Sequence, residues 1–212
     1  MYSILLGVQY ASIGLMLFMC AYITKKWSKP VHGWLFFYCC VTLINNAGYL
    51  GCMISRTEGE ALLSLQMSYL GRVWIPFSLL NFVIQFCTEK RYPKITTPLA
   101  IVHALVYFLM VLVKKTTLYY GSVTFIQDGI FPHITHTSGI FYYFYTILIL
   151  SYIVFALILL FKTMQKQKNS QKRKQIVFIT LAIVTDSVFY LIGKIPVFFC
   201  GLRKNKVIFN GL

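Results

Sequence analysis

The stretch MSYLGRVWIPFSLLNFVIQFC, residues 67–87, decides the class of fold. It is uncharged from Val73 through Thr88, a run of 16 residues, whereas a helix needs about 20 apolar residues to cross a bilayer. A membrane span at this place must therefore include Arg72, with Trp74 and Pro76 close behind it. We expect a transmembrane helix that carries an arginine.

The composition supports a membrane protein. Of 212 residues, 58% are hydrophobic and 12% are charged, and the mean hydropathy is +0.70. A soluble domain carries about 25% charged residues. The six cysteines lie mostly in apolar runs and show no CxxC or Cys/His spacing, so we predict no metal site, and no cofactor is expected.

Apolar runs bounded by charges predict six transmembrane helices, because lipid leaves backbone groups outside helices or closed barrels unpaired. The predicted spans are 2–24, 33–55, 65–87, 95–113, 139–161 and 175–193. Beyond them, residues 194–212 have too short an apolar core to cross, and we interpret them as a truncated seventh helix or an irregular tail. The predicted fold is an all-α membrane protein, a bundle of six transmembrane helices plus a remnant of a seventh, with residues 1–193 as its membrane domain.

Lysine and arginine are distributed unevenly over the loops between these spans. The first, third and fifth loops hold twelve of them, whereas the alternate loops hold four. Because cytoplasmic loops are enriched in Lys and Arg, this bias predicts an N-terminus outside and basic loops in the cytoplasm of a plasma-membrane protein. The net charge of +15 is thus a signal of topology and of anionic lipid rather than of nucleic acid.

The largest outer loop, 114–138, contains alternating apolar and polar residues and a turn signal at Asp128. These features predict a short β-hairpin. His133 and His136 lie three apart in the same loop, a spacing that favours metal chelation or pH sensing only weakly, because a third ligand is missing apart from Asp128. By contrast, His103 lies within a predicted span, and we expect it to be a hydrogen-bonded packing residue.

Arg72 has two interpretations. In a span that starts at residue 65 it lies about 10 Å deep, so its side chain could snorkel to the outer headgroups or face a polar interior. Asp186 on the sixth span falls at a similar depth, and an unpaired carboxylate there is costly. We therefore hypothesise an Arg72–Asp186 ion pair; the alternative is a neutral Asp186 bonded to a neighbouring hydroxyl. The hypothesis places the following polar side chains in one intramembrane layer: Gln9, Asn45, Asn46, Arg72 and Asp186.

Three stretches resemble one known family, the seven-helix membrane region at the N-terminus of bacterial sensor histidine kinases, which also precedes some diguanylate cyclases. SYLGRVWIPFSLLNFVIQF (68–86) resembles its third helix, HTSGIFYYFYTILILSYIVFALILL (136–160) the entry to its fifth, and SQKRKQIVFITLAIVTDSVFYLIG (170–193) its sixth. The similarity extends over about residues 1–193. The sequence departs from the family pattern where its seventh helix is cut short and no kinase or cyclase motif follows.

This resemblance implies a sensing and anchoring module that is not itself an enzyme, because the family's catalytic residues are missing from the chain. It further implies a small ligand, a homodimer and a cytoplasmic kinase or cyclase output domain as partners. A small transporter or channel subunit is the alternative from another class, since a charged mid-membrane layer also suits conduction. The chain has no internal repeat to support that alternative.

Overall fold

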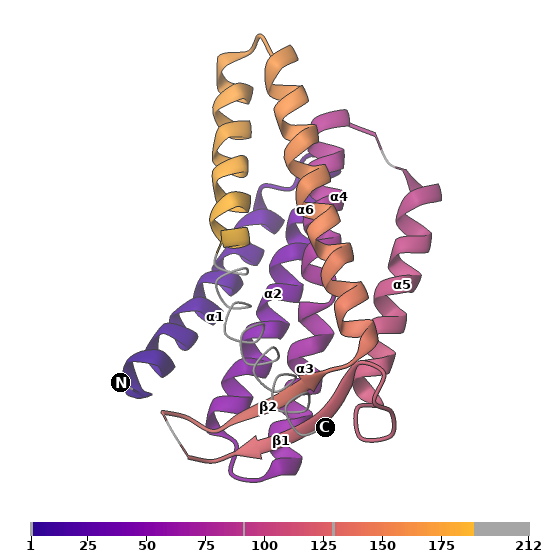
Figure 1. The fold of residues 1–212 in the computed structure, drawn as a ribbon. Coiled ribbons are helices and arrows are strands. Elements are labelled where there is room, and N and C mark those ends of the chain that lie inside the picture. The colour runs from indigo at the N-terminus through magenta and orange to yellow at the C-terminus, as the bar shows by residue number, and fades with distance from the viewer. Residues whose placement is uncertain (1, 91, 129, 189–212) are drawn as a thin grey trace. The chain divides into compact units, whose positions relative to one another are not determined.

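A computed structural model describes residues 2–90, 92–128 and 130–188 of the chain. These residues form six helices of known bounds: α1 (Tyr2–Lys25), α2 (Val31–Ile54), α3 (Glu58–Arg72), α4 (Trp74–Thr88), α5 (Pro93–Val111) and α6 (Ile140–Lys166). Within the described part, five helical stretches are long and apolar enough to cross a membrane, with α3 and α4 together counting as one stretch of 31 residues. The first five predicted spans are confirmed as helices, and the chain is a predominantly helical, multi-pass membrane protein (Figure 1).

The sixth predicted span overlaps a further helix at residues 170–188. That this helix crosses the membrane stays a prediction, and the predicted truncated seventh helix, 194–212, lies outside the described residues.

The chain forms two compact units, Met1–Tyr152 and Ile153–Leu212. In the second unit, α6 runs on to Lys166, and the Asn169 side chain accepts from the amides of Gln171 and Lys172 at 2.9 and 3.1 Å. The predicted basic loop is therefore mostly helical, with Asn169 capping the helix that follows it.

The third span begins earlier than predicted, at Glu58 rather than Leu65. Thr57 is its N-cap and accepts a hydrogen bond from the amide of Glu60, while the Glu60 carboxylate accepts from the amide of Arg56 at 2.8 Å. Such reciprocal capping stabilises a helix start, as do acidic residues in the first turn. Arg72 is thus the last of 15 residues in α3, about 21 Å from the helix start rather than about 10 Å.

The same span is interrupted at Val73, which lies between α3 and α4. Pro76 has no N–H to donate to the carbonyl of Arg72 four residues earlier, and its ring crowds that carbonyl. Proline thus accounts for the change of helix at Val73.

Small residues allow α2 and α3 to pack closely. A Cβ on Gly48 would lie 2.2 Å from the amide nitrogen of Ser68, and a Cβ on Gly71 would lie 2.2 Å from the carbonyl oxygen of Val41. Glycine is required where two membrane helices approach so closely that a Cβ would overlap the facing backbone. The two helices therefore pack more closely than residues with a larger side chain would allow.

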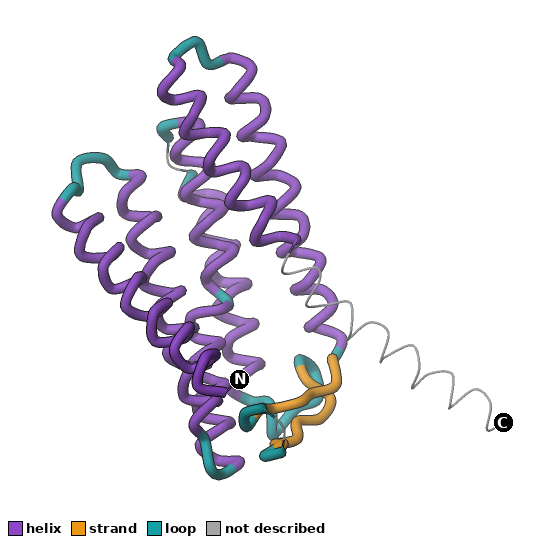
Figure 2. Tube along the Cα trace, turned by 90° about the vertical axis from the view of Figure 1, so that its left-hand side faces the viewer, coloured by secondary structure: helices purple, strands orange, loops and turns teal. Residues whose placement is uncertain are grey.

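The predicted β-hairpin is confirmed, and its place outside the membrane stays a prediction. Strands β1 (Tyr120–Ile126) and β2 (His133–Ser138) pair antiparallel, with Asp128 in the turn between them. Figure 2 shows the two strands in orange at one end of the helices, where they contact α2 and α3. The buried core beneath them is rich in tyrosine, including Tyr69, Tyr119, Tyr120 and Tyr142. This hairpin thus closes one end of the first unit.

Large apolar side chains cover the outward faces of the helices. Ile4 on α1, Leu63 on α3 and Ile101 on α5 are between 65 and 70% exposed. In water, such a surface would be strongly unfavourable. In a bilayer these side chains face lipid, as the composition predicts.

Candidate functional site

At the interruption of the third span, a backbone carbonyl accepts hydrogen bonds from side chains of other helices. Val73 is fully buried, and its carbonyl oxygen lies 2.7 Å from Nδ1 of His103 on α5. The hydroxyl of Tyr145 on α6 donates to the same oxygen at 2.9 Å. We call Val73, His103, Tyr145 and Tyr152 the Val73 node.

The geometry fixes the tautomer of His103. A carbonyl can only accept, so Nδ1 carries the proton and donates to Val73. Nε2 is then an acceptor, and the Tyr152 hydroxyl lies 3.2 Å from it. Both ring nitrogens of this fully buried imidazole are therefore paired. The expectation that His103 is a hydrogen-bonded packing residue is confirmed.

Aromatic rings surround the node. The Trp74 ring stacks on the imidazole at a centroid distance of 6.0 Å, and the Phe77 ring lies 5.3 Å away. A dry, apolar surrounding strengthens each hydrogen bond and makes an unpaired partner costly. The node therefore couples the third span to α5 and α6 through a few strong polar contacts.

Arg72 immediately precedes the node and packs against tyrosines. Its guanidinium carbon lies 4.9 Å from the ring centroid of Tyr49 and 5.0 Å from that of Tyr69, and it donates to the Tyr69 hydroxyl at 3.3 Å. Cation–π contacts of this kind stabilise a charge that has lost water. Asp186 lies in the second unit, and its ion pair with Arg72 stays a prediction.

The other residues of the predicted polar layer make pairwise contacts between neighbouring helices. Gln9 donates to the backbone carbonyl of Asn46 at 2.7 Å, and the Asn46 amide donates to Ser12 at 2.8 Å, so these residues join α1 to α2. Ser68 donates to the Asn45 side chain at 3.0 Å and thereby joins α3 to α2. Interhelical bonds of this kind support packing in lipid. A single layer shared with Asp186 stays a prediction.

The two histidines of loop 114–138, His133 and His136, both lie on β2. Their spacing of three puts them on opposite faces of the strand, because alternate residues share a face. The His136 ring lies 3.8 Å from the ring centroid of Tyr120, while Nδ1 of His133 lies 3.1 Å from the carbonyl of Phe131. No group of three metal-ligating side chains occurs in the described part of the chain.

Sequence reasoning missed the partners of His103. Tyr145 and Tyr152 belong to an aromatic-rich helix. Anchoring at the membrane interface explains most tyrosines of this helix as well as a hydrogen bond to another helix does. A partial signal was present at Pro76, since a proline inside a long span interrupts the helix near the carbonyl four residues earlier, here that of Arg72. His103 donates to the carbonyl of the next residue, Val73, and this contact is visible only in the fold.

The fold and its buried polar contacts define a multi-pass helical membrane protein whose spans are joined by side-chain hydrogen bonds. The model of the family described as "N-terminal 7TM region of histidine kinase" matches residues 9–202, so the chain belongs to this family. The resemblance of the three sequence stretches is therefore confirmed. The family represents the membrane sensory input region of histidine kinases. A search of curated proteins finds no match to the chain.

Proposed function

We propose that the chain detects a signal in or at the membrane and transmits it as a change of helix packing at the Val73 node. The observation that carries this proposal is the Val73 carbonyl, which accepts hydrogen bonds from side chains of α5 and α6. A side chain can release such a carbonyl without unfolding a helix. The node thus supports two packing states that a ligand could bind with different affinity.

The helix α6 offers a route from the node to the basic loop. It is continuous over 27 residues from Ile140 to Lys166, and Tyr145 lies near its start. A continuous helix moves as a rigid element, and small shifts of one helix along another are a common switching motion. A change at Tyr145 would therefore reach the basic loop that follows α6.

We further propose that the catalytic step belongs to a kinase or cyclase output domain, joined to this module or paired with it, and that the module acts as a dimer.

The orientation that suits this role has the N-terminus outside and the basic loops in the cytoplasm. Impermeant labelling of tags at Met1 and in loop 162–174 on intact cells tests it. Labelling of both tags from the same side would contradict the orientation.

The proposal is tested in membrane vesicles with a kinase output domain joined behind the full chain through an added transmembrane helix, which returns the chain to the side of the basic loops. Tyr145→Phe removes one hydrogen bond to Val73 with little change of shape. We expect it to change the autophosphorylation rate about fivefold or more, because coupling energies between sites start near this value. Tyr143→Phe, two residues earlier on an exposed face, is the matched control and should leave the rate unchanged.

An equal rate in wild type, Tyr145→Phe and His103→Gln, with all three folded, would contradict transmission through the node. Solute flux through vesicles containing the chain would instead favour a transporter. The same vesicles thus discriminate between a sensory and a transport function.

A further inference from the structure

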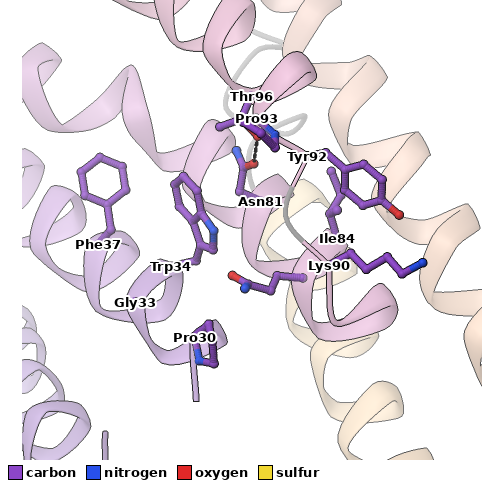
Figure 3. Close-up of a pocket in the computed structure, with 11 residues that line it drawn as sticks. Pro30, Gly33, Trp34, Phe37, Asn81, Ile84, Lys90, Tyr92, Pro93 and Thr96 are labelled. Atoms are coloured by element: carbon purple, nitrogen blue, oxygen red, sulfur yellow. Dashed lines mark hydrogen bonds between the residues drawn. The ribbon is translucent and has the colours of Figure 1, made fainter. Parts of the chain in front are cut away.

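A cavity of about 560 Å³ lies at the end of the first unit where α2 begins and α4 ends. Figure 3 shows its walls: Trp34 and Phe37 from α2, Asn81 and Ile84 from α4, and Thr96 from α5. Small-molecule sites typically have volumes of about 300–1,000 Å³. The cavity is therefore large enough for a ligand or a lipid headgroup.

One buried polar atom in this cavity is unsatisfied. Gln85 lines the cavity and is 6% exposed, and its Oε1 has no hydrogen-bond partner among the described residues. A buried acceptor without a donor is uncommon, because its desolvation is not compensated. Gln85 therefore offers an acceptor to a molecule that enters the cavity.

The neighbouring amide side chain, that of Asn81, differs from Gln85 because both of its polar atoms are paired. Asn81, one helical turn before Gln85, lines the same cavity and is buried to the same extent. Its Nδ2 donates to the carbonyl of Phe77 at 2.8 Å, and Thr96 donates to its Oδ1 at 2.9 Å. Asn81 is thus a structural amide, and only Gln85 of the two is available to a ligand.

The surroundings define the chemistry of the occupant. Trp34 and Ile84 give apolar walls, and Lys90 supplies a positive charge at the exposed rim. Pro30 and Pro93 also line the cavity, and Lys29 and Lys94 lie next to them in the chain. Basic residues at this level attract anionic headgroups. The occupant should therefore combine a phosphate, a nearby hydrogen-bond donor and an apolar part.

We propose that this cavity binds a phosphate ester with a neighbouring hydroxyl or amine N–H, which donates to Gln85 while the phosphate lies near Lys90. Such a ligand could be the head of a membrane phospholipid or a free phosphate ester. The site does not depend on the Val73 node, so it stands or falls independently of the proposed function.

The full chain in nanodiscs tests the donor requirement. Phosphatidylglycerol and phosphatidylethanolamine carry a hydroxyl and an N–H donor beside the phosphate, whereas phosphatidylcholine carries neither. We expect native mass spectrometry to show one of the two donor lipids retained about tenfold over phosphatidylcholine. Equal retention of all three lipids would overturn the proposal.

Gln85→Leu should abolish this preference, because it removes the acceptor and keeps an apolar side chain of similar size. Gln66→Leu is the matched control, since Gln66 lies on α3 of the same span and donates to the carbonyl of Val111. It should keep the preference. A preference unchanged in Gln85→Leu would overturn the assignment of Gln85, and Gln85→Met replaces that variant if it fails to fold.

The source of the ligand is distinguished by competition. Glycerol phosphate and phosphoethanolamine are added to nanodiscs that already hold the preferred lipid. Displacement of the lipid would identify a free phosphate ester as a ligand, whereas retention would identify the lipid itself. Lys90→Gln should weaken binding in both cases, and unchanged binding would overturn the role of the phosphate.

Discussion

The two ends of the first unit are built differently. At the hairpin end, buried tyrosines pack under β1 and β2, and the hydroxyls of Tyr69 and Tyr120 bond to each other. At the opposite end, called the basic end here because Lys29, Lys90 and Lys94 lie there, a cavity of about 560 Å³ is lined by residues of α2 and α4. The Gln85 amide oxygen is left unpaired there among the described residues. We therefore expect the hairpin end to be the more stable and the basic end the more adaptable, because binding regions are drawn from the less stable part of a fold.

The largest expected effect concerns two glycines of α2, one near each end. Gly48→Ala would place a methyl group 2.2 Å from the backbone of Ser68, and backbone cannot move aside cheaply. We expect a loss of about 3 kcal/mol or more in stability, because overpacking forces the helices apart. Thermal unfolding in nanodiscs, or the yield of folded protein, measures the loss.

Gly33→Ala is the matched variant at the basic end. Its methyl group would lie 3.3 Å from the Trp27 ring, which is half exposed and able to shift. Alanine also favours helix over glycine by about 1 kcal/mol, so the net change should stay within about 1 kcal/mol. Equal losses at Gly33 and Gly48 would contradict a difference between the two ends.

A second, smaller effect is expected at the Val73 node, which lies between the two ends. His103→Leu leaves Val73 with one donor and the buried Tyr152 hydroxyl without its acceptor. Each unsatisfied buried group costs about 1–3 kcal/mol. The melting temperature should fall clearly, whereas His133→Leu at a half-buried position of the hairpin should change it little. An unchanged melting temperature in His103→Leu would show that the node does not stabilise the bundle.

A third prediction uses pH to probe the hairpin end. Burial raises the pKa of Tyr120 above its usual value, so the folded protein holds this proton where the unfolded chain releases it. Stability is then fully present below about pH 10, the ordinary tyrosine pKa, and falls as the pH rises above it. Tyr120→Phe should lose about 1 kcal/mol at neutral pH with its bond to Tyr69, and should show a shallower alkaline decline. An unchanged alkaline decline in this variant would contradict the prediction.

These differences between the ends are only partly readable in the sequence. Apolar runs predict the helices, because lipid admits few alternatives, and alternation with a turn residue at Asp128 predicts the hairpin. The early start of the third span was missed, although Thr57 and Glu60 have the spacing of a capping box. Capping is a local signal, and it was overlooked because hydropathy alone set the boundary.

The candidate sites were harder to predict, because they depend on contacts between distant segments. Arg72 was found from its charge, but its tyrosine neighbours come from two helices. Asn81 and Gln85 look alike in sequence, being amides on one helix face four residues apart. Thr96 donates a hydrogen bond to Asn81 only. The sequence pattern does not predict which of the two amides has a partner.

The smallest expected change in stability concerns these two amides, Asn81 and Gln85. Gln85→Leu removes a buried oxygen that has no hydrogen-bond partner in the described structure, so in lipid lacking a ligand the melting temperature should stay the same or rise slightly. Asn81→Leu breaks bonds to Phe77 and Thr96 and should lower stability by about 1–2 kcal/mol. A loss in Gln85→Leu as large as that in Asn81→Leu would mean that Gln85 also has a structural partner, such as a bound water. The buried polar groups of the basic end would then be as fully hydrogen-bonded as those of the hairpin end. The cavity would no longer be the more adaptable part of the first unit.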